Sequence, residues 1–257
     1  MLATYARYDS RFAEILKLKP YNDFEIATHI SLKNKYVFVQ VGKAASSNVK
    51  WVLQSLELRS TPWKRPRDVH DKFQSPHLSP FQLDGDTLID AFFSDSYKRF
   101  AFVRNPFTRI LSCYLHRIVG AERSGSNKKL KDLTGGRGGG EVSFDEFVEI
   151  IYAQDSYDQD EHWRCQSDDL AVEHVHYDFI GKVENYVNDI EAVVSDIYGS
   201  KGLRWLQRRP NVDSSPMKTG AVEKLRRYYR DEGTVSRLLR RYEPDFVRFG
   251  YPLELQI

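Results

Sequence analysis

The fold is decided by one stretch of sequence, Tyr36-Val37-Phe38-Val39-Gln40-Val41-Gly42-Lys43-Ala44-Ala45-Ser46-Ser47-Asn48. Its first six residues are apolar except for one glutamine, and they are rich in β-branched and aromatic side chains. This composition is typical of a short strand that is buried on both faces of a parallel sheet. Residues 49–56 then carry apolar side chains at helical spacing. The stretch therefore predicts a strand, a tight loop and a helix.

The same order recurs further along the chain. Residues 99–103 predict a second buried strand, and Pro106 stands where the next helix begins, a position that tolerates a missing N–H. Residues 178–183 predict a third strand, followed by a helix that continues through Ile197. The alternation predicts an α/β fold, a three-layer P-loop-like domain with a central parallel sheet flanked by helices.

Length and composition are those of an ordinary globular protein. The chain has 257 residues, of which 41% are hydrophobic, enough for a proper core. We predict a single domain over 1–257, with an N-terminal extension at 1–35 and a flexible, basic, glycine-rich loop at 119–142. The 38 Lys and Arg nearly cancel the 36 Asp and Glu. The whole molecule therefore lacks the positive field that gathers nucleic acid, and no nucleic acid partner is expected.

Cysteine content and hydropathy bear on the compartment. Cys113 and Cys165 are the two cysteines, and two free thiols in a reducing compartment are the simplest interpretation. Residues 1–20 contain no apolar run suited to a signal peptide. The chain also lacks about 18 consecutive apolar residues, so no membrane span is expected. These features favour a soluble cytoplasmic protein.

The loop after the first strand suits a phosphate group. Gly42 and Lys43 lie between a strand and a helix, where backbone N–H groups and the positive helix end attract anions. Residues 46–48 add polar donors. A Walker A loop would need glycine in place of Val37 and Ser or Thr in place of Ala44, so ATP hydrolysis is disfavoured. A simple turn with a solvated lysine remains the alternative.

A second polar pair follows the second predicted strand. Arg104 lies at the end of that strand, and Ser112 lies eight residues on, about two helical turns at ~1.5 Å per residue. A bent connection could let both side chains hold one phosphate. The alternative is a helix-surface serine and an arginine that pairs with a carboxylate.

Both blocks resemble those of sulfotransferases that use 3′-phosphoadenosine 5′-phosphosulfate (PAPS). Residues 41–48 are similar to the 5′-phosphosulfate loop of that family, and residues 102–114 are similar to its 3′-phosphate motif. Residues 161–166 and 177–184 resemble two elements of the carbohydrate sulfotransferase branch that contains the chondroitin and HNK-type enzymes. Residues 245–251 also fit that branch.

The resemblance implies a role for each matching residue. It implies that Lys43 and the backbone N–H groups of residues 44–48 bind the 5′-phosphosulfate, and that Arg104 and Ser112 bind the 3′-phosphate. Lys43 would also stabilise charge on the bridging oxygen, so no metal is expected. The complete cofactor-binding set is Gly42, Lys43, Ala44, Ala45, Ser46, Ser47, Asn48, Arg104, Ser112, Ser214 and Lys218.

The acceptor side of the reaction calls for a base. A hydroxyl is a weak nucleophile while protonated, and histidine is the usual base near neutral pH. His162 lies in a family-like block and is the predicted catalytic base, with His116 as the second candidate. Glu161 could orient or replace the imidazole, and Trp163 could stack on a sugar ring or pack in the core. His116, Glu161 and Trp163 are the predicted substrate contacts.

The sequence thus predicts transfer of a sulfuryl group from PAPS to a hydroxyl of a carbohydrate acceptor, which gives PAP and a sulfate ester. Two other functions stay open, a P-loop phosphotransferase using ATP and a non-catalytic anion- or glycan-binding module. Three residues depart from the family pattern, namely Gly42, Ala45 and Cys165. A soluble bacterial-type member is expected, and the Golgi lumen is expected only if an N-terminal anchor has been removed.

Overall fold

The structure is a computed structural model that describes every residue except 1–4, 6, 122, 210–218 and 257. The chain divides into two compact units. The first, here called the sheet unit, comprises Met1–Val103 and Leu170–Ser215. The second, here called the helical unit, comprises Arg104–Asp169 and Pro216–Ile257. Each unit is described by itself, and the single domain over 1–257 stays a prediction.

The sheet unit holds a four-stranded sheet in the order β1-β2-β3-β4. Its strands are β1 (Thr28–Ser31), β2 (Tyr36–Val39), β3 (Lys98–Val103) and β4 (Phe179–Lys182). Strands β2, β3 and β4 run parallel, with Phe38 beside Phe100 and Ala101 beside Ile180. The three predicted strands and the α/β class are therefore confirmed. The sheet is mostly rather than wholly parallel, because β1 pairs with β2 in the antiparallel sense.

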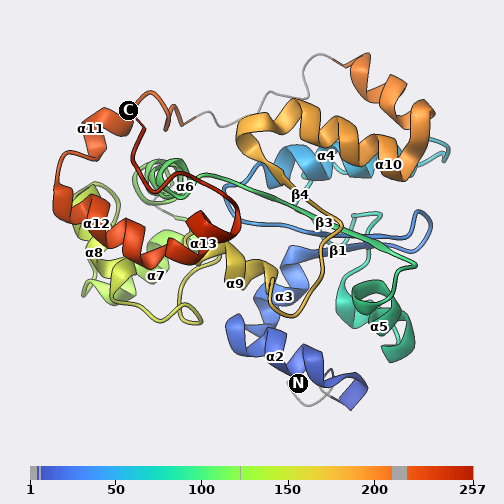
Figure 1. Cartoon of the computed structure of the whole chain (residues 1–257), viewed down its shortest axis with the longest axis horizontal. Helices are drawn as coiled ribbons and strands as arrows, with labels where there is room; N and C mark the ends of the chain where they lie inside the picture. The colour runs from blue at the N-terminus through green and yellow to red at the C-terminus, as the bar shows by residue number, and fades with distance from the viewer. Residues whose placement is uncertain (1–4, 6, 122, 210–218, 257) are drawn as a thin grey trace. The chain divides into compact units, whose positions relative to one another are not determined.

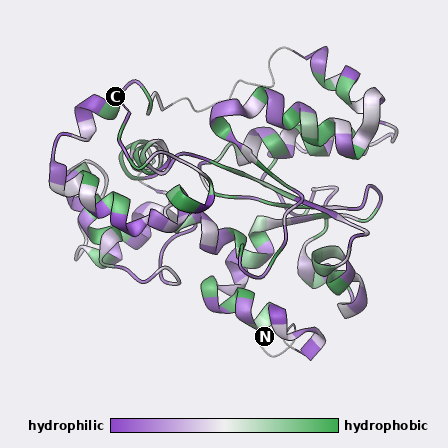
Figure 2. Cartoon of the chain, in the orientation of Figure 1, coloured by the Kyte–Doolittle hydropathy of each residue, from purple (hydrophilic) through white to green (hydrophobic). Residues whose placement is uncertain are grey.

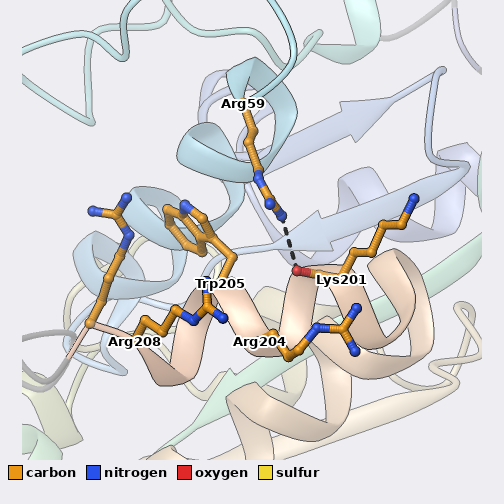
Figure 3. A pocket seen from close by; sticks show the side chains of 6 residues that line it. Arg59, Lys201, Arg204, Trp205 and Arg208 are labelled. Atoms are coloured by element: carbon orange, nitrogen blue, oxygen red, sulfur yellow. Dashed lines mark hydrogen bonds between the residues drawn. The ribbon is translucent and has the colours of Figure 1, made fainter.

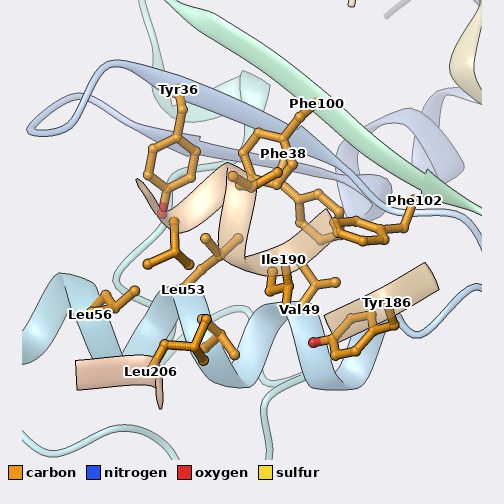
Figure 4. Packing of buried hydrophobic residues seen from close by; sticks show 13 residues of the cluster. Tyr36, Phe38, Val49, Leu53, Leu56, Phe100, Phe102, Tyr186, Ile190 and Leu206 are labelled. Atoms are coloured by element: carbon orange, nitrogen blue, oxygen red, sulfur yellow. The ribbon is translucent and has the colours of Figure 1, made fainter. Parts of the chain in front are cut away.

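One face of the sheet carries the main hydrophobic core. Residues two apart on a strand share a face, so Tyr36 and Phe38 of β2 lie beside Phe100 and Phe102 of β3 (Figure 4). These rings pack against helix α4 (Ser46–Leu58) and helix α10 (Tyr186–Gln207). The apolar residues that predicted these helices are the buried ones, namely Val49, Val52, Leu53, Leu56, Ile190, Val193 and Val194.

Among its described residues, the sheet unit has three further α-helices, α2 (Ser10–Leu18), α3 (Tyr21–Ala27) and α5 (Gly85–Phe93). Figure 1 shows α3 and α5 on the side of the sheet opposite α4 and α10. The ring of Phe12 lies 5.6 Å from that of Phe92, and the ring of Phe24 lies 5.5 Å from it. The part of the segment 1–35 that the structure describes, predicted as an extension, thus contributes α2, α3, β1 and part of the core.

The helical unit contains no strand among its described residues. Its α-helices are α6 (Pro106–Cys113), α7 (Gly125–Leu133), α8 (Phe144–Tyr152), α9 (Gln166–Leu170), α11 (Leu225–Tyr228), α12 (Glu232–Arg241) and α13 (Glu243–Arg248), and a π-helix, η2 (Tyr114–Val119), follows α6. Figure 2 shows hydrophilic and hydrophobic residues mixed along these helices, as expected for helices packed on one side. Within the described part of the chain, no helix is long and apolar enough to cross a membrane.

Part of the predicted flexible loop is helical. Within 119–142, residues Gly125–Leu133 form α7, so the loop prediction is wrong for these residues. The hydroxyl of Ser124 caps the helix by accepting from the N–H of Asn127 at 3.1 Å, and Leu130 is buried. Lysine is a good helix former, so a capped, lysine-rich segment can be helical once one apolar residue is buried.

Candidate functional site

The loop between β2 and α4 makes a sharp turn. Lys43 and Ala45 have left-handed backbone conformations, with φ of 66° and 59°. Such values are uncommon outside glycine and cluster at functional sites. Helix α4 begins directly afterwards at Ser46, and no side chain caps its N-terminus. The first N–H groups of a 13-residue helix therefore have no side-chain partner at the end of a parallel strand, where an anion is favoured.

A hydrogen-bonded chain of side chains supports this loop. The Oγ of Ser47 lies 2.9 Å from Nε2 of His70, and Nδ1 of His70 lies 2.7 Å from Nζ of Lys50. Lys50 is 2% exposed and also donates to Oε1 of Gln40 at 2.8 Å. An ammonium can only donate, so Nδ1 accepts and Nε2 carries the proton that is donated to Ser47. The hydroxyl proton of Ser47 is then left to donate to an anion. Neither Lys50 nor His70 was among the predicted site residues.

The residue that follows β3 is held by a buried amide. Gln166 is fully buried, and its side chain accepts from the N–H of Arg104 at 2.9 Å and donates to the carbonyl of Arg104 at 2.8 Å. Asp245, also fully buried, accepts from the N–H groups of Gln166 and Ser167 at 2.9 and 2.8 Å. Burial raises the pKa of the Asp245 carboxyl, and nearby Arg109 and these hydrogen bonds oppose that rise. The backbone of Arg104 is thus fixed from α9 and α13.

The side chains of Arg104 and Ser112 both lie along helix α6. The Nε of Arg104 donates to Oγ1 of Thr108 at 3.0 Å. Thr108 and Ser112 are four residues apart on α6 and so share one face of it. Ser112 is 3% exposed, and its Oγ accepts from Oγ1 of Thr219 at 3.2 Å. Arg104, Thr108 and Ser112 therefore form a polar row along α6. Thr108 was not among the predicted site residues.

His162 is paired with a carboxylate. Its Nδ1 lies 2.7 Å from Oδ1 of Asp160 and 3.8 Å from Oε1 of Glu161. Asp160, which was not predicted, is the closer acid, and it also accepts from the N–H of His162 at 2.9 Å. Burial raises the pKa of the Asp160 carboxyl, but its hydrogen bonds with His162 outweigh burial and lower the pKa overall. An acceptor on Nδ1 fixes the tautomer and leaves Nε2 able to take a proton.

The segment around His162 is anchored by two buried arginines. Arg109 donates to the carbonyl of Arg164 at 2.6 Å and to that of Glu161 at 3.2 Å. Nη2 of Arg164 donates to the carbonyl of Gln159 at 2.5 Å, and Nη1 of Arg164 donates to Oδ1 of Asp169 at 3.0 Å. These contacts hold the backbone on both sides of His162. Such rigidity suits a base that must be positioned.

The remaining predicted residues lie as follows. Trp163 is fully buried, its Nε1 donates to Gln154 at 3.0 Å, and its ring meets that of Phe147 edge-on, which leaves no exposed face for a sugar. His116 is half-buried in η2. Ser214 and Lys218 lie outside the described residues. Cys113 and Cys165 are buried free thiols, as predicted.

The predicted site residues thus fall into two groups. Residues 42–48 lie in the sheet unit, whereas Arg104, Ser112, His116 and His162 lie in the helical unit. An anion-binding loop after one parallel strand and an arginine after the next are typical of α/β proteins that bind phosphorylated ligands at strand ends.

Comparison with known proteins specifies the class further. A model of the sulfotransferase family matches residues 27–252, and the chain belongs to this family. It is 26% identical to carbohydrate sulfotransferase 14 of Danio rerio in an alignment that covers 93% of the chain and 66% of the relative. It is 27% identical to human carbohydrate sulfotransferase 14, covering 88% of the chain and 60% of the relative. It is 28% identical to human carbohydrate sulfotransferase 9, covering 87% of the chain and 52% of the relative.

The chain therefore spans less than two thirds of the length of these relatives. No solved structure matches the chain significantly.

Proposed function

We propose that this protein transfers a sulfuryl group from PAPS to a hydroxyl of a carbohydrate acceptor. The observation that carries the proposal is the loop 42–48, with its lysine and its uncapped helix N-terminus, in a chain that belongs to the sulfotransferase family. The names of the relatives support a carbohydrate acceptor. The helices on both sides of the sheet support a three-layer, P-loop-like arrangement of the sheet unit.

Two phosphate-binding roles follow. Lys43 and the N–H groups of residues 44–48 bind the 5′-phosphosulfate, with the hydroxyl of Ser47 as a further donor. Arg104 binds the 3′-phosphate together with the hydroxyl of Ser112. Thr108 positions the Arg104 side chain, because its own hydroxyl proton is donated to the carbonyl of Asn105 at 3.1 Å. The hydroxyl of Ser47 and the side chain of Arg104 are thus held by protein hydrogen bonds before any ligand binds, which is the condition for strong electrostatic stabilisation.

The transfer step needs a base and a stabilised leaving group. Nε2 of His162 takes the proton from the acceptor hydroxyl as its oxygen forms a bond to sulfur. The bond between sulfur and the bridging oxygen breaks, and PAP leaves with the electron pair. Lys43 stabilises the charge that develops on that oxygen. Asp160 stabilises the imidazolium that forms on His162.

A transfer assay with labelled PAPS and a panel of neutral and acidic oligosaccharides tests the proposal. Label should pass to at least one sugar without Mg²⁺, and Lys43→Ala should abolish the transfer. Lys64→Ala, at an exposed lysine of the same unit, should leave it intact. Phosphoryl transfer from ATP that depends on Mg²⁺ would favour the phosphotransferase instead. Ligand binding without any transfer would favour a non-catalytic module.

A further inference from the structure

A basic pocket lies in the sheet unit, on helices α4 and α10. It has a volume of about 420 Å³ and is lined by Arg59, Lys201, Arg204, Trp205, Arg208 and Arg209 (Figure 3). The volume is within the range of small-ligand sites. The lining contains five cations and no carboxylate. Within the described part of the chain, no carboxylate forms an ion pair with any of the five.

The pocket owes its shape to a break in α10. Gly199 has φ of 63° and ψ of −168°, which interrupts the helix. Beyond the break, the carbonyl of Lys201 accepts from Nη1 of Arg59, the residue that follows α4, at 2.9 Å. Trp205 stacks on Trp51 of α4, with ring centroids 6.0 Å apart. The second half of α10 is thereby fixed against α4.

The cations gather on one face although they repel one another. Lys201, Arg204 and Arg208 are spaced three and four residues apart and are exposed on the same side of the helix. Like charges at this spacing destabilise a helix. The helix dipole favours cations in the last turn, but it does not account for Lys201 or for Arg59, which reaches the pocket from α4. A ligand that supplies negative charge would remove the repulsion.

The aromatic contacts limit the kind of anion. One face of Trp205 is covered by Trp51, and the guanidinium of Arg209 lies 4.4 Å from the centroid of its ring. The indole thus already stacks on one aromatic ring and lies against one guanidinium, which disfavours stacking of a nucleobase, whereas proteins that bind single-stranded nucleic acid depend on such stacking. The net charge of +2 also provides little field for nucleic acid. A ligand with several anionic groups and no bases fits the pocket better.

We infer that this pocket is a binding site for a polyanionic sugar chain, one that carries sulfate or carboxylate groups. Guanidinium groups suit such ligands because they donate two parallel hydrogen bonds to one anionic group. The inference rests on the proposed function, because it gives the proposed glycan substrate a second point of contact. The site is distinct from loop 42–48, since none of the loop's residues lines the pocket.

Binding of a heparin octasaccharide to the full chain, measured by calorimetry, tests the inference. Arg204→Gln with Arg208→Gln should weaken binding at least tenfold and lower the slope of log affinity against log salt by about two, one for each cation removed. The matched control is Lys64→Gln with Arg67→Gln, which removes two exposed cations of the same unit and should change neither quantity. An octasaccharide that is fully desulfated, N-acetylated and carboxyl-reduced carries no anionic group and should bind weakly.

Several results would overturn the inference. Equal losses of octasaccharide affinity in the pocket and control variants would show a diffuse charge effect. Single-stranded DNA of matched charge that binds as tightly as the octasaccharide would show the same. Loss of PAP binding in the pocket variant would assign the pocket to the donor site. Failure of the parent to bind PAP, with octasaccharide binding intact, would remove the proposed function but leave the pocket as a glycan site.

Discussion

At the scale of single residues, the hydroxyl of Ser47 depends on His70, which is 23 positions away. His70 donates to that hydroxyl because buried Lys50 occupies its other nitrogen. If the hydroxyl donates to the 5′-phosphate of PAP, it contributes roughly 1.5–3 kcal/mol, so Ser47→Ala should weaken PAP binding at least about tenfold.

His70→Ala should also weaken PAP binding, but the double variant should bind no more weakly than Ser47→Ala alone. The reason is that His70 acts through the hydroxyl that Ser47→Ala removes. His176→Ala, at an exposed histidine of the same unit, serves as the control. Losses that add in the double variant would show that His70 acts by another route.

The pairing of His162 with Asp160 makes a second prediction. His162→Ala should lower kcat by roughly 10²–10⁴ while PAP affinity is retained, because general-base catalysis is worth that much. Asp160→Asn should lower kcat less, since the imidazole remains but loses its charged partner. Turnover and PAP affinity are measured in parallel. Near-parental turnover in His162→Ala, with loss of turnover in His116→Ala, would transfer the role to His116.

The lowered pKa of Asp160 also predicts a pH dependence of stability. A carboxyl whose pKa is lower in the folded state stabilises that state above its unfolded pKa of about 3.9. This stabilisation is lost as the pH falls through the folded pKa. The free energy of unfolding of Asp160→Asn should thus fall below that of the parent at pH 6, and the difference should shrink as the pH falls below about 3.9. Urea titrations at several pH values measure these free energies, with Asp132→Asn as the exposed control. A difference between parent and Asp160→Asn that does not depend on pH would contradict the prediction.

At the scale of elements, the hydrogen bonds from Gln166 of α9 hold Arg104, the first residue of the helical unit. Gln166→Ala removes both side-chain bonds to Arg104 and should weaken PAP binding as well as lower stability by about 1–3 kcal/mol. Gln159→Ala is a matched control, because Gln159 is equally buried and its amide donates to the carbonyl of Ile151. It should lower stability without affecting PAP affinity. Equal PAP affinity in the two variants would contradict a role for these hydrogen bonds.

The elements that were predicted correctly have strong local patterns. The apolar run at 36–41 and the helical spacing after it correctly predicted β2 and α4. Strand β1 was missed because it is four residues long and carries Thr, His and Ser, which are buried by partners elsewhere in the chain. Helix α7 was missed because its lysines and the glycines on both sides of it are typical of a loop.

The supporting contacts of the site could not be predicted for a related reason. Gln166 is 62 residues from Arg104, and Asp245 is 79 residues from Gln166. A local sequence pattern spans only a few residues, so it does not reveal contacts between residues this far apart in the chain. Asp160 is the exception, since it lies only two positions before His162, whereas the predicted acidic neighbour was Glu161.

At the scale of the whole molecule, the chain belongs to the sulfotransferase family, and the proposed donor site draws on residues 42–48 and on Arg104 and Ser112. Calorimetric titration with PAP in the absence of Mg²⁺ tests this most directly, beside Lys43→Ala, Arg104→Ala and the control Lys64→Ala. Our account predicts tight binding to the parent and the control, weakened at least tenfold in each of the other two. A folded parent that does not bind PAP, or binding that survives both substitutions, would contradict it.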